Sequence, residues 1–140
     1  MASDAFCDWA AGLEWLSDIE TLEFEPWKRT VAFVVQFGLM TMGDGAGSLF
    51  YNHPERVEHV ADALAAVGEL GMAQQVLAID TLLQPLWDAQ PDDLQSALVT
   101  EVLEGVAAAP CAVLDAELNS KWQAIQDRLE ALARTNGWSG

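Results

Sequence analysis

The chain has 140 residues, which suits one domain with one core, and 51% of them are hydrophobic, which argues against an intrinsically disordered chain. Its 22 acidic residues outnumber six basic ones, giving a net charge of −16 at pH 7 that strongly disfavours direct binding to nucleic acid or to an anionic membrane. The natural counterpart is a basic protein or a small cation, although solubility or adaptation to a salty cytoplasm would give the same composition.

Three features predict a cytoplasmic protein with no membrane partner. Cys7 and Cys111 are far apart and form no Cys-x-x-Cys pair, so free thiols in a reducing compartment are favoured over a single bridge. Asp4 and Asp8 lie where a signal peptide would carry positive charge. The longest apolar run, residues 31–42, is too short and too interrupted to cross a bilayer.

Two amphipathic segments begin the chain. Residues 3–20 carry apolar side chains at spacings of three and four residues, which predicts a helix with Ser3 as its N-cap. A second helix is expected from Pro26, which follows Glu25 and suits a first helical turn. Its residues 31–42 are apolar around most of the helix surface, so we expect this helix to be central and buried.

A glycine-rich stretch, GDGAGSLFYN from Gly43 to Asn52, interrupts the helical pattern. It superficially suggests a nucleotide-binding loop, but it lacks the G-x-G-x-x-G spacing, has no lysine after the glycines and does not follow a strand. Asp44 within it would also repel a phosphate. The favoured interpretation is a turn in which glycine supplies positive φ angles and lets two helices approach closely.

Two helices are predicted after this stretch. Residues 52–71 carry an apolar stripe and end at a glycine, either Gly68 or Gly71. Residues 72–87 form the next helical segment, which Pro85 ends or kinks.

Two more helices complete the prediction. Residues 91–106 begin with a proline and two acids, which the helix dipole favours in a first turn. Pro110 marks a further break, and the last helix covers roughly residues 119–135. We therefore expect an all-α fold: a single compact domain over residues 1–140, with five to six helices around one buried central helix.

Few residues are arranged for catalysis or metal binding. His53 and His59 are six residues apart, which is not the i, i+4 spacing of a helical zinc pair. Glu55, His59 and Asp62 share a helix face, but such residues are usually solvated. The chain has no G-x-S-x-G nucleophile motif, and neither cysteine has a base nearby in sequence. We expect no enzyme, no metal and no cofactor.

The carboxylates form clusters along the predicted helices. One set lies at intervals of three, four and seven residues, so it is expected to line one helix face: Glu55, Glu58, Asp62 and Glu69. Steps of about 4.5 to 6 Å along a helix are coarser than the phosphate spacing of about 3.4 Å along a nucleic-acid strand, but comparable with it. The other residues assigned to an acidic partner-binding surface are Glu20, Glu23, Asp88, Asp92, Asp93, Glu101 and Glu104.

Six tryptophans are many for this length. An exposed tryptophan would indicate an interface anchor, whereas one in an apolar stripe belongs to the core. Core positions are expected for Trp9, Trp27 and Trp122, and the less clearly placed residues are Trp15, Trp87 and Trp138.

The order of these segments resembles a family of small acidic helical bacterial proteins whose described member is a DNA mimic. There, a long helix precedes a Gly-Gly-Phe-x-x-Tyr-Phe-x-Asn-like motif and a helix ending in Ala-Leu-x-x-(Ile/Val)-Gly. The similarity covers Val31 to Leu83, although here the paired glycines are separated and one aromatic residue is missing. It implies an all-helical, dimeric protein whose carboxylates imitate DNA phosphates. The matching residues are Gly45, Gly47, Phe50, Tyr51, Asn52, Ala63, Leu64, Val67 and Gly68.

The leading hypothesis is an inhibitor that occupies the nucleic-acid-binding site of a basic DNA- or RNA-binding protein, such as a regulator. Because some members of the similar family lie near toxin genes, the alternative is an immunity or antitoxin protein that neutralises a basic nuclease. A third interpretation is an acidic domain, adapted to salt, whose charge has no part in binding.

Overall fold

The computed structural model describes the backbone of residues 1–89 and 92–140, and the side chains of residues 1–86 and 98–140. Within this part the chain is helical with no strand, so the predicted all-α class is confirmed. The helices in chain order are α1 (Asp4–Ala11), α2 (Asp18–Leu22), α3 (Pro26–Asp44), α4 (Gly47–Asn52), the 3-10 helix η1 (Pro54–Arg56), α5 (Val57–Ala66), α6 (Leu70–Ala89), α7 (Asp92–Glu104) and α8 (Ala108–Thr135).

The long helix α3 is the buried centre of the fold, as its apolar sequence predicts. Eight consecutive residues, 31–38, are buried, and the helix packs against α1, α2, α4, α5 and α8. Pro26 occupies the first turn, where a missing N–H removes no hydrogen bond of the helix. A helix apolar on all sides is stable only when other helices cover every side, which this arrangement achieves.

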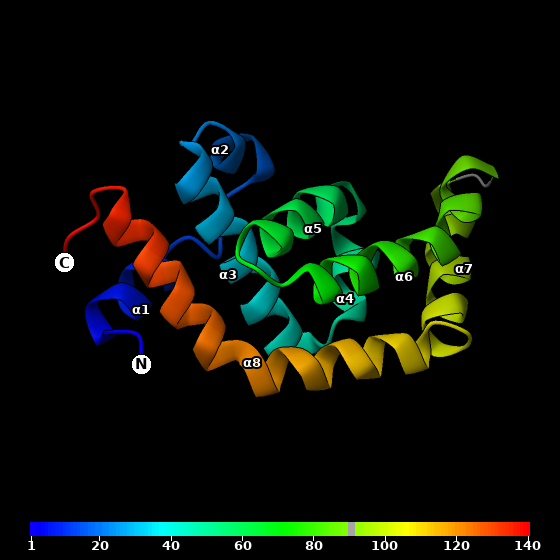
Figure 1. The fold of residues 1–140 in the computed structure, drawn as a ribbon. Helices are drawn as coiled ribbons and strands as arrows, with labels where there is room; N and C mark the ends of the chain where they lie inside the picture. The colour runs from blue at the N-terminus through cyan, green and yellow to red at the C-terminus, as the bar shows by residue number, and fades with distance from the viewer. Residues whose placement is uncertain (90–91) are drawn as a thin grey trace.

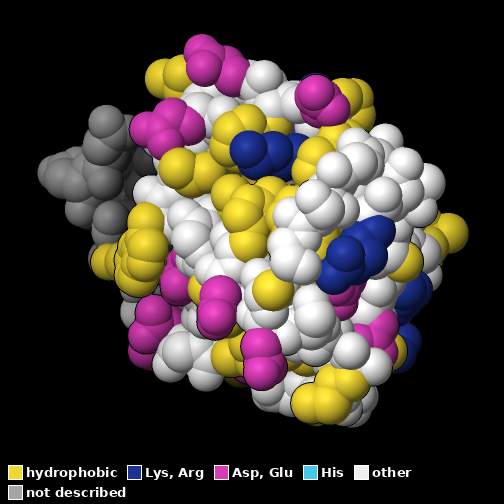
Figure 2. Space-filling model, turned by 90° about the vertical axis from the view of Figure 1, so that its left-hand side faces the viewer, with side chains coloured by type: hydrophobic (Ala, Val, Ile, Leu, Met, Phe, Trp, Pro, Cys, Tyr) yellow, Lys and Arg dark blue, Asp and Glu magenta, His cyan; other side chains and the backbone are white. Residues whose placement is uncertain are grey.

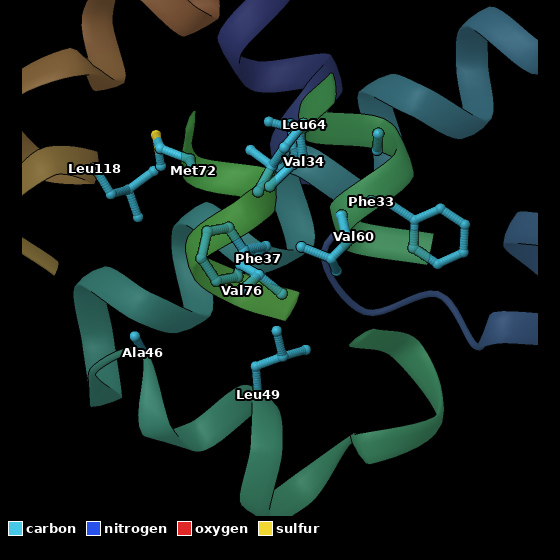
Figure 3. Packing of buried hydrophobic residues seen from close by; sticks show 14 of the residues in the cluster. Phe33, Val34, Phe37, Ala46, Leu49, Val60, Leu64, Met72, Val76 and Leu118 are labelled. Atoms are coloured by element: carbon cyan, nitrogen blue, oxygen red, sulfur yellow. The ribbon is translucent and has the colours of Figure 1, made fainter. Parts of the chain in front are cut away.

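One cluster of buried apolar side chains connects the helices. It takes residues from α1 and from α3 to α8, and Figure 3 shows side chains of α3, α4, α5, α6 and α8 pointing into it. Phe37, Leu64 and Leu118 in this cluster are fully buried. Each such side chain contributes about 1.5–3 kcal/mol relative to an exposed position, so the core is the main source of stability.

The two ends of the molecule differ. Both chain termini lie at one end, together with α1 and the last turns of α8 (Figure 1). The opposite end is formed by the last turns of α6, by α7 and by the first turns of α8 (Figure 1). No helix in the described part of the chain has the length and hydropathy needed to span a membrane.

The single helix predicted over residues 3–20 is two helices. Ser3 does cap α1, because the backbone N–H of Phe6 donates to its hydroxyl at 3.2 Å. A second cap, Ser17, accepts from the N–H of Glu20 at 3.2 Å and starts α2 after a turn. Spacing alone did not reveal this break, because Leu13 is buried even though it lies in the turn.

The glycine-rich stretch is only partly a turn. Gly45 has a φ of 88° and ends α3, as expected for a residue without a side chain, and its N–H donates to Thr41 O at 2.8 Å. Residues 47–52 form the short helix α4, which the prediction missed. Asp115 of α8 accepts from the N–H of Ala46 at 2.7 Å and so stabilises the start of α4 from a distant part of the chain.

Two prolines do not end helices where the sequence suggested. Pro110 lies in the first turn of α8, which therefore begins at Ala108 and not near residue 119. A proline is tolerated there because the first N–H groups of a helix have no partner within it. α6 continues through Pro85 to Ala89. With the extra α2 and α4, the described residues contain eight α-helices where five or six were expected.

Candidate functional site

The structure distributes the predicted acidic residues over several helices. Glu20 and Glu23 are exposed on α2 and at its C-terminal end. Glu55, Glu58 and Asp62 are exposed on η1 and α5, and Glu101 and Glu104 are exposed on α7. The side chains of Asp88, Asp92 and Asp93 lie outside the described residues.

Glu69 is not part of an exposed acidic row, and this part of the prediction is wrong. Its side chain is buried, and its carboxylate accepts from Arg128 and from Lys121 of α8, the latter at 3.3 Å. Burial raises the pKa of Glu69, but the hydrogen bonds from Arg128 and Lys121 outweigh this effect and hold the pKa below its ordinary value. Lys121 also donates to Glu117 at 2.8 Å. Glu69 therefore joins the α5–α6 connection to α8.

Glu55 does not lie on α5 either. It belongs to η1, which begins at Pro54, and its carboxylate lies 3.7 Å from His53 Nδ1. Since α5 runs only from Val57 to Ala66, the predicted face of four carboxylates is reduced to Glu58 and Asp62. The described residues include no group of three His, Cys, Asp or Glu side chains that could hold a metal ion.

Most basic side chains are already neutralised by carboxylates. Arg56 Nε lies 2.6 Å from Asp18 Oδ1, and Arg134 lies 2.7 Å from Glu130. The ammonium of Lys28 instead lies 4.2 Å from the centre of the Phe24 ring. Because positive charge is used within the fold, the remaining carboxylates determine the charge presented to a partner.

The positive charges are confined to part of the chain. Residues 57–120 contain eleven acidic residues and no lysine or arginine. This segment, which we call the base-free segment, includes α5, α6, α7 and the first half of α8, and it supplies the end of the molecule opposite the termini (Figure 1). The chain segment that forms this end therefore supplies no positive side chain of its own.

Where the base-free segment meets the end of α3, carboxylates of two helices share one surface hollow. Asp44 at the end of α3 and Glu104 of α7 line one surface hollow of about 430 Å³. Glu101 lies one helical turn from Glu104 on α7. The carboxylate of Asp115 lies beside Gly45, the residue after Asp44, because a Cβ atom built on Gly45 would be 3.7 Å from it. We call Asp44, Glu101, Glu104 and Asp115 the acidic corner. No basic side chain is among the described residues that line the hollow.

The end of the molecule that carries the termini looks different. Figure 2 shows acidic side chains there separated by apolar and basic ones, so this face has no continuous acidic band. Of the residues predicted for the acidic surface, only Glu101 and Glu104 belong to the acidic corner.

A cavity of about 320 Å³ lies between the α1–α2 connection, α3, α4 and η1. We call it the Gln36 cavity, because Gln36 is a fully buried polar residue in its wall. The sequence signal for this feature is a lone glutamine inside an apolar run. The other residues in the wall are Glu14, Trp15, Leu16, Leu39, Met40, Gly43, Asp44, Ser48, Asn52, His53 and Arg56.

A second cavity of about 320 Å³ lies between α3 and α5. Here His59 stacks on Phe33 with ring centres 5.1 Å apart, and Asp62 and Arg29 also line the wall. The buried Arg29 Nε has no hydrogen-bond partner among the described residues. The cavity holds both an acid and a base, so its charge favours neither an anion nor a cation.

The side chain of Trp87 lies outside the described residues; the other five tryptophans divide as the sequence suggested, with one addition. Trp9, Trp27 and Trp122 pack against the core, and Trp138 joins them. Trp15 is 85% exposed and lies at the edge of the Gln36 cavity.

Comparisons with known proteins give no match to a family model, a curated protein or a solved structure. The resemblance to DNA-mimic proteins therefore stays a hypothesis, and the functional argument rests on the geometry of this chain.

Proposed function

We propose that this protein is a DNA mimic, which binds a basic nucleic-acid-binding protein and blocks its nucleic-acid site. The observation that carries the proposal is the acidic corner, where Asp44 of α3 and Glu104 of α7 line one hollow without a basic side chain in its described lining, and Glu101 lies one helical turn from Glu104. Residues 1–140 would act as one domain in this role. The proposal replaces the predicted broad acidic surface with a smaller one.

The electrostatics favour a basic partner over any other. The base-free segment carries half of the 22 acidic residues and none of the six basic ones, so its field attracts positive charge from a distance. A nucleic-acid-binding protein has its basic residues gathered on one surface, which matches a local concentration of carboxylates. Ion pairs formed at such a surface weaken as salt screens them.

The experiment compares two double variants with equal charge. Partners are captured on the immobilised protein, and the affinity of a basic partner is measured over a salt series for wild type, E101Q/E104Q and E20Q/E23Q. Both pairs are exposed glutamates three residues apart, but only the first lies in the acidic corner. We expect E101Q/E104Q to weaken binding several-fold and E20Q/E23Q to have little effect.

Competition with duplex DNA provides the second half of this test. A mimic and DNA exclude each other, so DNA should displace the protein from its partner at low salt. Equal weakening by the two double variants, a flat salt dependence, or simultaneous binding of DNA would each contradict the proposal. If the captured partner is a nuclease whose cleavage stops on binding, the same surface performs the immunity role.

A further inference from the structure

Helix α6 carries apolar side chains on its exposed side as well as on its buried side. The exposed fractions of Leu70, Leu77 and Leu82 are 59%, 43% and 39%. Single exposed leucines are normal, but a contiguous set on one surface marks an interaction site. The inner side of the same helix supplies fully buried residues to the core: Met72, Val76, Ile79 and Leu83.

The exposed residues of α6 form one continuous face without a charge. A helix turns about 100° per residue, so all exposed residues between positions 70 and 86 lie within about 160° of its circumference. The half-buried Gln75 and Asp80 lie at the two edges of this face, and Asp80 is the only charged residue between positions 70 and 86. We call the exposed residues the outer face of α6: Leu70, Gly71, Gln74, Leu77, Ala78, Thr81, Leu82, Gln84 and Pro85.

Helix α3 shows what a helix with apolar residues on opposite sides requires. It is covered by α1, α2, α4, α5 and α8, which together enclose its apolar surface. α6 packs mainly against α5, α7 and α8, and it lies between α5 and α8 in Figure 1. Since these contacts leave the outer face exposed, the fold covers α6 on one side only. The missing cover is the position of a binding partner.

The charges around the outer face favour a basic partner. α5, α7 and the first half of α8, which pack against α6, belong to the base-free segment. The second half of α8 supplies Lys121 and Arg128, but both of them pair with Glu69. Asp80 at the edge of the face forms no ion pair with a described residue. A second copy of this chain, with its charge of −16, and an anionic membrane are both repelled by such surroundings.

We propose that the outer face of α6 binds an amphipathic helix of a partner protein, whose apolar stripe is bordered by lysine or arginine. The apolar stripe would pack against Leu70, Leu77 and Leu82, which extend over about 18 Å, the length of a helix of about 13 residues. The basic residues would lie near Asp80 and the other carboxylates of the base-free segment. The outer face includes no residue of the acidic corner, so this proposal does not rest on DNA mimicry.

A leucine–lysine peptide of about 14 residues is the probe, with its leucines at spacings of three and four residues so that they form one helix face. One control peptide has the same composition with its leucines spread around the helix, and a second has glutamate in place of every lysine. At constant ionic strength we expect calorimetry to show at least tenfold tighter binding of the probe than of either control. The first control measures the apolar stripe and the second measures the charge.

Two double variants with unchanged net charge locate the binding site. L70Q/L77Q removes two exposed leucines from the outer face and should weaken probe binding about tenfold. I19Q/L22Q removes two exposed apolar side chains from α2 and should leave it unchanged. Because all four side chains are exposed, both variants should keep the helical content of the wild type, which circular dichroism measures.

NMR and sedimentation complete the test. The backbone amide signals of residues 70–82 should shift on addition of the probe, and those of α2 should not. Equal losses in the two double variants, or equal affinity for the probe and either control peptide, would overturn the proposal. So would a wild-type dimer that L70Q/L77Q converts to a monomer, since the occupant would then be a second copy. Binding to phosphatidylcholine vesicles that L70Q/L77Q abolishes would likewise assign the face to a membrane.

Discussion

At the scale of single residues, Gly38 determines how closely α8 crosses α3. A Cβ atom at this position would lie 2.2 Å from the ring of Trp122, far below any normal contact. The glycine costs helix stability in the middle of α3, but it allows the indole to lie directly against the helix backbone. Gly43 in the same helix has no atom within 4 Å of such a Cβ.

We predict opposite effects for alanine at these two glycines. G38A should lower the free energy of unfolding by about 1–3 kcal/mol, because the Trp122 ring must move out of a packed position. G43A should raise it by up to about 1 kcal/mol, since alanine favours the helix and meets nothing. Urea unfolding measures both. If the smaller side chain in the double variant G38A/W122L restores part of the lost stability, the contact with the Trp122 ring is the cause. Equal changes in unfolding free energy for G38A and G43A would contradict the prediction.

Glu130 holds the start of the chain against α8 through two hydrogen bonds with Ser3. Its carboxylate accepts from the backbone N–H and from the hydroxyl of Ser3, both at 2.7 Å. These two hydrogen bonds, helped by Arg134, lower the pKa of Glu130 to about 2. The N-terminal residues are thereby attached to α8 at Glu130, which is 127 positions after Ser3.

This low pKa predicts an acid-sensitive contribution to stability. In the unfolded chain Glu130 has a pKa near 4.5, so its contribution is complete above that pH and is lost as pH falls towards 2. The difference in unfolding free energy between wild type and E130Q should therefore shrink from pH 6 to pH 2.5. Chemical unfolding over this range measures it. E58Q, which removes one negative charge at an exposed glutamate of α5, is the control variant.

At the scale of helices, an aromatic cluster connects the first helix with the C-terminal residues. Trp138 contacts Phe6 edge to face with ring centres 5.4 Å apart, and its centre lies 5.4 Å from that of Trp9. Trp9 in turn stacks on Trp27 of α3 at 6.2 Å. The guanidinium of Arg134 lies 4.7 Å from the centre of the Trp138 ring. α1, α3 and the end of the chain are thus packed together.

We predict that W138A destabilises the protein by about 1–3 kcal/mol, because it removes a half-buried ring that contacts two aromatic rings and the guanidinium of Arg134. W15A removes the same atoms from an 85% exposed position and should change the stability by less than about 0.5 kcal/mol. Thermal unfolding of the two variants provides the comparison. Similar losses in both would show that the cluster does not hold the C-terminal residues.

At the scale of the whole molecule, the charge of −16 is distributed unevenly. Half of the acidic residues lie in the base-free segment, while four of the six basic residues form ion pairs with carboxylates: Arg56, Lys121, Arg128 and Arg134. Repulsion among like charges destabilises the folded state and is screened within about 10 Å at 0.1 M salt. The stability of the folded state should therefore depend on the salt concentration, which sets the strength of this repulsion.

We predict that the melting temperature rises between 20 mM and 500 mM sodium chloride, because salt screens this repulsion. E101K/E104K should show a smaller rise than wild type, since it reduces the net charge in the acidic corner. Calorimetric melting at several salt concentrations measures both. A melting temperature that falls with salt would show that the ion pairs of α8 outweigh the repulsion.

Much of the fold could be predicted from local patterns. The apolar run of α3, the Ser3 cap and the buried stripe of α5, which includes Val57, Val60 and Leu64, follow from contacts between residues up to four positions apart. The break after α1 and the helix α4 did not follow, because tertiary packing overrides local preference there. Asp115, which accepts from Ala46 N–H at the start of α4, is 69 positions away.

The candidate sites depended still more on distant residues. Exposure of Trp15 and isolation of the Gln36 oxygen are properties of surroundings that α1, α2, α3 and α4 create together. Glu69 has the spacing of a surface acid, yet its partners Lys121 and Arg128 are 52 and 59 positions away and withdraw it from the surface.

By itself, the sequence determined the helical class, the buried centre and the excess of negative charge. Hydrophobic periodicity is a pattern among residues close together in the chain, and net charge is a sum over all residues, so neither depends on the fold. Only the tertiary structure decided which carboxylates are used within the fold and which meet at Asp44 and Glu104. The physical reason is that an electrostatic surface depends on distances in space, and these arise only when helices far apart in the chain pack together.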